Sequence, residues 1–158
     1  MKRVADLQEC LSCSCFAIRR AARAVTQHYD RRLRPTGLRA TQLTLLVVLA
    51  LEGSKPLGYI ASRLGTERTT LTRNLRPLIA RGLVASEPHE DRRIQLLEAT
   101  PRGIAAARKA LPVWREAQRT IGALLTPDAR RSLDATTQAV ARARSAGSRR
   151  STGRKKEG

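Results

Sequence analysis

The chain has 158 residues, of which 31 are lysine or arginine and 13 are aspartate or glutamate, so its formal net charge is +18. This length allows one domain with a hydrophobic core, and a hydrophobic content of 41% excludes a wholly disordered chain. The charge favours a polyanionic partner, namely DNA, RNA or an anionic membrane surface. Only four residues are aromatic, which argues against single-strand binding on an aromatic platform.

The compartment can be inferred from the same composition. Asp6 and Glu9 interrupt the start of the chain, so no apolar signal-peptide core develops. The strongest apolar run, Leu43–Leu51, is far shorter than the ~20 residues needed to cross a bilayer. The three cysteines are an odd number in one cluster, unlike the framework of a secreted disulfide-rich domain. We therefore expect a cytoplasmic protein without a membrane partner.

Apolar spacing predicts three helices in the first part of the chain. A long helix spans about residues 6–34 and ends before Pro35. The second contains Leu43–Leu51, which is apolar all round and therefore predicts an element buried on every side. The third is short, opens at Pro56 and ends at Gly65.

A fourth helix, two strands and two more helices follow. Thr66 is the predicted N-cap of the fourth helix, and Gly82 is a natural stop for it. Pro112 lies inside the fifth helix and predicts a kink or a break there. The C-terminal tail, residues 145–158, lacks an apolar face and is predicted to be disordered. The predicted ranges are 83–86 and 94–99 for the strands, about 100–125 and 126–143 for the helices, and 145–158 for the tail.

This order of elements predicts a mainly α protein with a small β-wing. Its centre is a winged helix-turn-helix flanked by N-terminal and C-terminal dimerisation helices. The predicted regions are an N-terminal dimerisation helix (1–36), the winged helix-turn-helix (37–100), C-terminal dimerisation helices (101–144) and a disordered basic tail (145–158).

The fourth helix has two different faces. Leu71, Leu75, Leu78 and Ile79 form one apolar stripe that docks on the second helix. A helix whose other face carries hydroxyls and guanidiniums can enter a DNA major groove, where arginine bonds guanine in a bidentate way. A solvated basic face is the alternative, but the short helix, tight turn and hairpin around it favour DNA. The DNA-binding candidates on this helix are Thr66, Arg68, Thr69, Thr70, Thr72, Arg73 and Arg76.

The predicted hairpin has a charged tip. Arg92 and Arg93 would lie where a minor groove passes, and an arginine inserted there gains from its negative potential. Asp91 is two residues from Arg93 and can pair with it, or it can simply balance surface charge. After a recognition-type helix, this tripeptide indicates a DNA-contacting wing.

Four segments of the chain form a recognisable set: Thr69-Thr70-Leu71-Thr72-Arg73, Arg81-Gly82-Leu83-Val84, Asp91-Arg92-Arg93 and Leu96–Gly103. With these motifs the sequence resembles the MarR family of bacterial transcriptional regulators. The resemblance implies a homodimer that grips double-stranded DNA at a pseudo-palindromic operator, with Asp91 orienting Arg93. It also implies a transcriptional regulator, for which we expect repression. Pro77 departs from the family pattern and predicts a bend after Arg73.

Three interpretations of Cys10, Cys13 and Cys15 compete. They can be small apolar fillers in a dimer interface, thiols of an oxidant sensor, or ligands of a soft metal. The metal interpretation is the weakest, because zinc sites usually need four ligands. The resembled family includes thiol sensors and members that bind small phenolic or carboxylate effectors. Thiol oxidation and binding of a small-molecule effector are therefore both candidate signals for this protein.

No enzyme constellation is present in the sequence: there is no phosphate-binding glycine loop, zinc-protease motif or nucleophile elbow. We therefore expect no enzyme and no cofactor. One rival is a basic architectural or RNA-associated protein that binds without reading sequence. The other is a thiol redox enzyme. The cysteines of this sequence, however, lack the neighbouring strand and turn that such a site needs.

Overall fold

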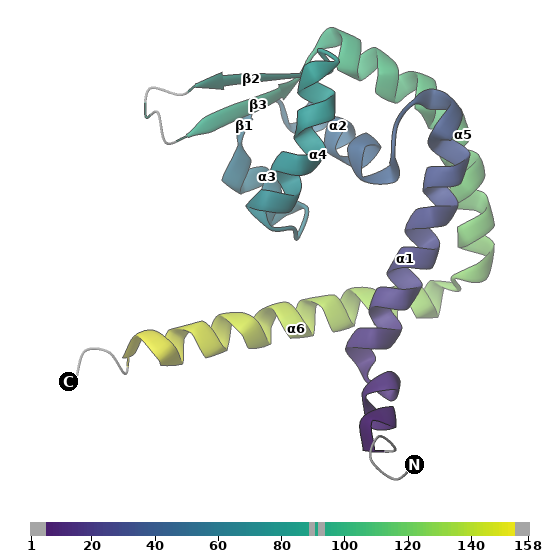
Figure 1. The fold of residues 1–158 in the computed structure, drawn as a ribbon, viewed down its shortest axis with the longest axis vertical. Coiled ribbons are helices and arrows are strands. Elements are labelled where there is room, and N and C mark those ends of the chain that lie inside the picture. The colour runs from purple at the N-terminus through teal and green to yellow at the C-terminus, as the bar shows by residue number, and fades with distance from the viewer. Residues whose placement is uncertain (1–5, 89–90, 92–93, 154–158) are drawn as a thin grey trace. The chain divides into compact units, whose positions relative to one another are not determined.

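The structure is a computed structural model that describes residues 6–88, 91 and 94–153. The chain forms two compact units, Met1–Gln118 and Arg119–Gly158. The predicted fold class is confirmed, with helices and one small sheet (Figure 1). The elements of the first unit are η2 (Asp6–Ser12), α1 (Ser14–Leu33), η3 (Arg34–Thr36), α2 (Ala40–Glu52), β1 (Lys55–Pro56), α3 (Leu57–Arg63), α4 (Arg68–Ala80), β2 (Val84–Pro88), β3 (Gln95–Ala99) and most of α5 (Pro101–Leu124).

The N-terminal segment is divided, so the prediction of one helix over residues 6–34 was wrong. A short 3-10 helix, η2, ends at Ser12, and α1 begins at Ser14. Cys13 between them is extended, and its Sγ accepts a hydrogen bond from Phe16 N at 3.3 Å. A side chain that accepts a hydrogen bond from the backbone amide three residues on caps the start of a helix and satisfies one of its unpaired N–H groups. Cys13 therefore divides the segment.

Helix α2 supplies most of the core of the first unit. Its buried residues are Gln42, Leu43, Leu45, Leu46 and Leu49. The prediction that α2 is buried on every side was nevertheless wrong, because Val47 and Leu51 are 38% and 80% exposed. The elements α1, α4 and β3 contact α2 and cover only part of its circumference.

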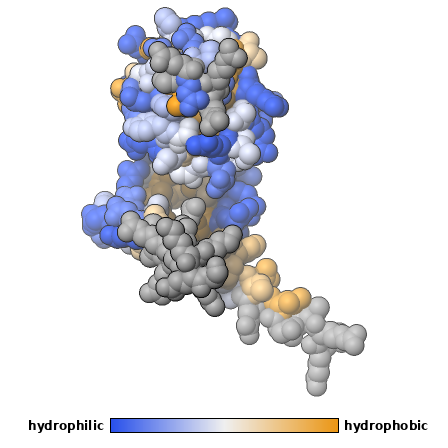
Figure 2. Space-filling view, turned by 90° about the vertical axis from the view of Figure 1, so that its left-hand side faces the viewer, coloured by the Kyte–Doolittle hydropathy of each residue, from blue (hydrophilic) through white to orange (hydrophobic). Residues whose placement is uncertain are grey.

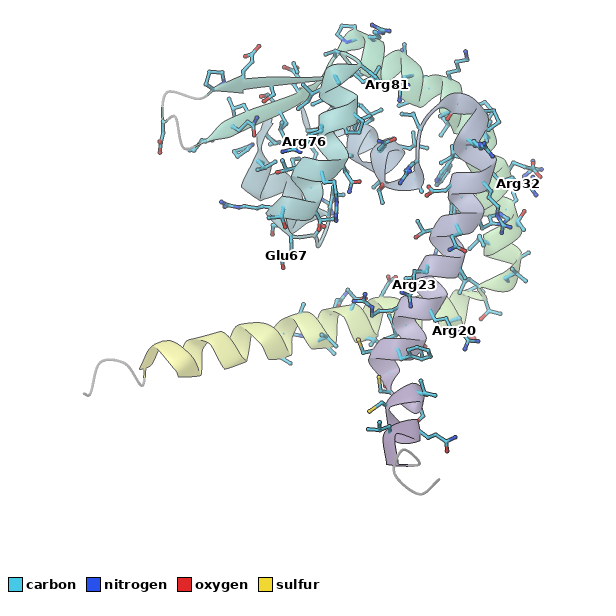
Figure 3. The ribbon with its side chains drawn as sticks, viewed as in Figure 1. Arg20, Arg23, Arg32, Glu67, Arg76 and Arg81 are labelled. Atoms are coloured by element: carbon cyan, nitrogen blue, oxygen red, sulfur yellow. The ribbon has the colours of Figure 1, made fainter. Side chains whose placement is uncertain are left out.

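Helices α3 and α4 form a helix-turn-helix. The turn contains Gly65 at a φ of +60°, a left-handed conformation that favours glycine. The N-cap of α4 is Glu67 (Figure 3), so the predicted cap at Thr66 was one residue too early. The backbone of Thr66 still belongs to the turn, because its N–H donates to Ala61 O at 2.9 Å.

Neither proline inside a helix breaks it. Helix α4 continues through Pro77 to Ala80, and α5 continues through Pro112 to Leu124, so the predicted break at Pro112 is absent. Leu75 and Leu78, on both sides of Pro77, are buried in the core. Packing on both sides therefore outweighs the ~3 kcal/mol that a proline costs inside a helix.

The wing is a three-stranded antiparallel sheet in the order β1-β3-β2. Strands β2 and β3 agree with the predicted hairpin to within two residues and pair Val84 with Ala99. Strand β1 was not predicted, because two residues that include Pro56 show no strand periodicity. It pairs Lys55 with the fully buried Leu97 of β3.

The start of α5 is bonded to the corner between α4 and β2. Thr100 Oγ1 donates to Gly82 O at 2.8 Å and accepts from Gly103 N at 3.0 Å. A Cβ atom at Gly103 would lie only 2.0 Å from Leu83 O. Residue 103 is therefore a glycine, because the backbone of Leu83 occupies the space that a side chain would fill.

The second unit contains the end of α5 and helix α6 (Pro127–Gly153). Thr126 Oγ1 accepts from Ala129 N at 3.2 Å at the start of α6 and caps this helix. The helix runs beyond the predicted end near Ala143, so the expectation of disorder from Ser145 was wrong as far as Gly153. Residues 154–158 lie outside the described part, and within that part no helix is long and apolar enough to cross a membrane.

Candidate nucleic-acid interface

Helix α4 presents one face to the core and another to the surface. Leu71, Leu75 and Leu78 are at most 2% exposed. Ile79, which was predicted to share this stripe, is 37% exposed, because it lies ~80° around the helix from Leu71 and beyond the packed elements. The exposed candidates are Arg68, Thr69, Thr72, Arg73 and Arg76. The structure therefore brings five of the predicted residues together on the open side of α4.

Two predicted DNA contacts lie elsewhere. Thr66 and Thr70 are half-buried and line a cavity of about 430 Å³ between α4 and the helices α1 and α2. Their hydroxyls therefore flank the exposed face of α4. Thr72 is on that face, where its hydroxyl also donates to Arg68 O at 2.9 Å.

Arg68 at the start of α4 lies against α3. A Cβ atom built at Gly58 would be 2.7 Å from Arg68 Nη2. The guanidinium therefore crosses the first turn of α3, where the missing side chain of Gly58 leaves space for it. Sequence spacing did not single out Gly58.

The charged tip of the wing is only partly described. Asp91 is exposed, and its carbonyl oxygen accepts from Ile94 N at 2.8 Å. The predicted minor-groove residues Arg92 and Arg93 lie outside the described residues.

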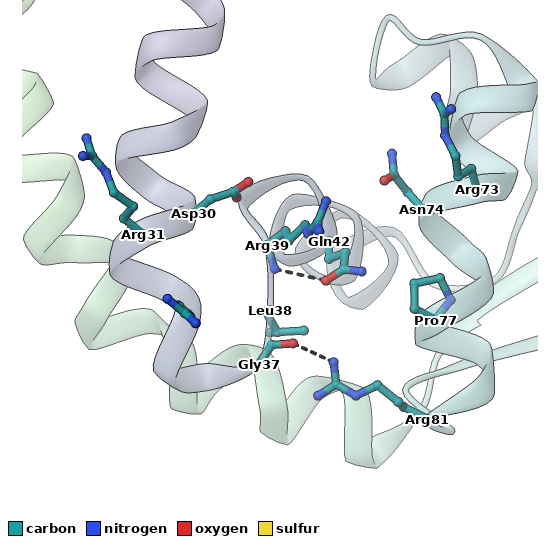
Figure 4. Close-up of a pocket in the computed structure, with 11 residues that line it drawn as sticks. Asp30, Arg31, Gly37, Leu38, Arg39, Gln42, Arg73, Asn74, Pro77 and Arg81 are labelled. Carbon is teal, nitrogen blue, oxygen red and sulfur yellow. Dashed lines mark hydrogen bonds between the residues drawn. The ribbon is translucent and has the colours of Figure 1, made fainter.

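An open cleft beside α4 was not predicted from the sequence. It has a volume of about 890 Å³ and lies between the end of α1, the start of α2 and one flank of α4 (Figure 4). Five arginines line it: Arg31, Arg34, Arg39, Arg73 and Arg81. They come from α1, η3, the loop before α2, α4 and the turn after α4, so no local motif groups them in the sequence.

The three cysteines are free thiols at the start of the chain. Cys10 lies in η2, Cys13 caps α1 and Cys15 is in its first turn, and all three are exposed in the protomer. They are therefore not fillers of the protomer core. Among the described residues no three His, Cys, Asp or Glu side chains are placed to hold a metal ion.

Comparisons with known proteins agree with this geometry. The sequence profile of the MarR family matches residues 38–94. The Mycobacterium tuberculosis transcriptional regulator MosR, crystallised in complex with DNA, is 41% identical with a TM-score of 0.76, and the match covers 84% of this chain and 99% of that chain. No curated protein sequence matches.

Two more distant structures share the fold. A mutant MarR from Escherichia coli with operator DNA is 21% identical with a TM-score of 0.67, covering 78% of this chain and 90% of that chain. MepR from Staphylococcus aureus with DNA is 18% identical with a TM-score of 0.67, covering 83% and 98%. Because this chain spans nearly all of a regulator to which it is 41% identical, and carries the family profile over its helix-turn-helix and the first part of its wing, it belongs to the MarR family of DNA-binding transcriptional regulators.

Proposed function

We propose that the protein is a homodimeric repressor that binds a pseudo-palindromic operator with one α4 in each of two successive major grooves. The exposed face of α4 carries this proposal, because its hydroxyls and guanidiniums are held outward by a buried leucine stripe. Arg73 and Arg76 are the candidates for guanine contacts, and Thr69 and Thr72 for phosphates or thymine methyl groups. The half-sites would be ~10 base pairs apart.

Exposed apolar residues support the homodimer. Leu7, Leu11 and Ile18, at the start of the chain, are 59%, 62% and 49% exposed. Figure 2 shows apolar residues gathered near this end of the chain. In the second unit, α6 exposes Leu133 and Val140. A second copy would remove these side chains from water, and a two-fold dimer would double the base contacts of a single helix-turn-helix.

Footprinting tests the proposed function. DNA upstream of the protein's own gene should contain a protected palindrome, and a short duplex with that palindrome should stay bound in an excess of random DNA. Equal loss of binding to specific and random competitor would instead support a basic architectural protein.

The wing assignment predicts the effect of Arg93→Ala. This variant should bind the operator at least about 30-fold more weakly, because each lost arginine contact costs ~1–3 kcal/mol and a homodimer loses two of them. Fluorescence anisotropy on the operator measures the change, and size-exclusion chromatography should show an intact dimer. An affinity equal to that of the unmodified protein would exclude the predicted role of Arg93.

A thiol-oxidation signal is favoured as the release mechanism by the position of the cysteines. Cys13 Sγ accepts the Phe16 amide at the start of α1, beside the apolar residues of the proposed dimer interface. Oxidation to a disulfide would remove this thiol cap and reposition the start of α1. A small-molecule effector is the alternative signal.

Diamide should therefore release the operator from the native protein. A variant in which Cys10, Cys13 and Cys15 are all serine should stay bound, because it cannot form the disulfide, while serine preserves a helix cap. Gel-shift titration with and without dithiothreitol measures the release. If both proteins respond alike to diamide, the cysteines do not carry the signal.

A further inference from the structure

The cleft beside α4 carries an excess of positive charge. Its five arginines face one acid, Asp30, whose Oδ1 accepts a hydrogen bond from Ala40 N at 2.7 Å. Arg81 Nη1 donates to Gly37 O at 2.7 Å. Within the described ranges, no side chain pairs with Arg34, Arg39 or Arg73. Guanidinium groups stay charged at any physiological pH, so the cleft is suited to an anion.

The position of the cleft relative to α4 indicates which anion. Asn74, Pro77 and Arg81 lie on the flank of α4 between its buried stripe and its exposed face, and Arg73 belongs both to that face and to the cleft. A major groove is ~12 Å wide, about the diameter of a helix with its side chains, so a sugar-phosphate strand runs along each flank of an inserted helix. One of these strands would pass over the cleft.

We propose that the cleft binds backbone phosphates of the operator strand that borders α4, with Arg34 and Arg39 as phosphate contacts. Arg39 lies between the α1 and α4 walls, and Arg73 and Asn74 are on the α4 wall (Figure 4). This proposal rests on the insertion of α4 into the major groove.

The lining favours DNA phosphate over a small organic anion. Pockets for small molecules are mostly lined by apolar and aromatic side chains with a few polar groups. Among the eleven residues that line this cleft, only Leu38 and Pro77 have apolar side chains, and none is aromatic. A polyanion that contacts several separated guanidiniums fits this lining better.

The salt dependence of DNA binding tests the proposal. The variants are Arg39→Gln and Arg34→Gln, and the matched control is Arg32→Gln, an exposed α1 arginine outside the cleft (Figure 3). Affinity is measured against salt concentration for the operator and for a random duplex. Each cleft variant should reduce the slope of log K against log salt by about 1.8, since a dimer loses two phosphate contacts of about 0.9 each. Arg32→Gln and the charge-conserving Arg39→Lys should keep the original slope.

The two duplexes separate this proposal from the proposed function. Phosphate contacts carry no sequence information, so the cleft variants should lose affinity for both duplexes by the same factor. If the unmodified protein shows no preference for the operator, sequence-specific regulation is wrong, but the slopes on random DNA still test the cleft. If Arg34→Gln and Arg39→Gln keep the original slope while their thermal unfolding is unchanged, the cleft does not bind phosphates.

Discussion

Arg73→Ala should reduce operator affinity by at least about 30-fold. A bidentate arginine–guanine pair is worth ~1–3 kcal/mol, and a homodimer would lose two such pairs, or ~2–6 kcal/mol. Arg73 is exposed, and its side chain has no partner within the described residues, so the change should leave the fold intact. Fluorescence anisotropy with the operator and with a scrambled duplex measures the loss, which should be much larger for the operator.

Two comparisons make the Arg73 result specific. Arg73→Lys keeps the charge but not the planar pair of donors, so it should retain binding to the scrambled duplex and still lose operator preference. Arg32→Ala, on the exposed surface of α1, should leave the preference unchanged. Equal losses on both duplexes for Arg73→Ala would show that Arg73 contacts phosphates and does not read bases.

Gly103→Ala should lower the free energy of unfolding by at least ~3 kcal/mol. The added Cβ would lie 2.0 Å from Leu83 O and 2.9 Å from Leu83 C, which are backbone atoms and cannot rotate away. Overpacking costs ~1–3 kcal/mol even where side chains can adjust, and here the start of α5 must move away from β2. For a chain of this length, thermal unfolding should shift down by about 6–12 °C.

Gly122→Ala is the matched control for Gly103→Ala, because both glycines lie in α5 and the change is the same. A Cβ at Gly122 meets no atom within 4 Å. Replacing glycine by alanine inside a helix stabilises it by ~0.5–1 kcal/mol, so this variant should unfold at an equal or higher temperature. A similar loss of stability in both variants would contradict the steric explanation for Gly103.

The helices and the main DNA-facing residues could be predicted because they depend on local pattern. Leu71, Leu75 and Leu78 repeat at helical spacing, and the same geometry places Arg73 and Arg76 on the opposite face. Gly65 and Gly82 mark the ends of elements, as their positive φ values of +60° and +64° require. The MarR motif Thr69–Arg73 lies in this locally determined part.

The errors are found where a side chain or a neighbouring element competes with the local pattern. Cys13 caps α1 and divides the predicted N-terminal helix. Leu51 is apolar yet 80% exposed, because no described element packs on that side of α2.

The sequence alone determined the winged helix-turn-helix and the basic face of α4, since helical spacing and turn residues act within about ten positions. Only the tertiary structure decided that Thr66 and Thr70 flank that face, that Gly103 has no space for a side chain, and that the arginines from α1 to α4 share one cleft. These features depend on contacts between residues far apart in the chain, such as Arg81 and Gly37, and such contacts follow from packing and leave no periodic signal in the sequence.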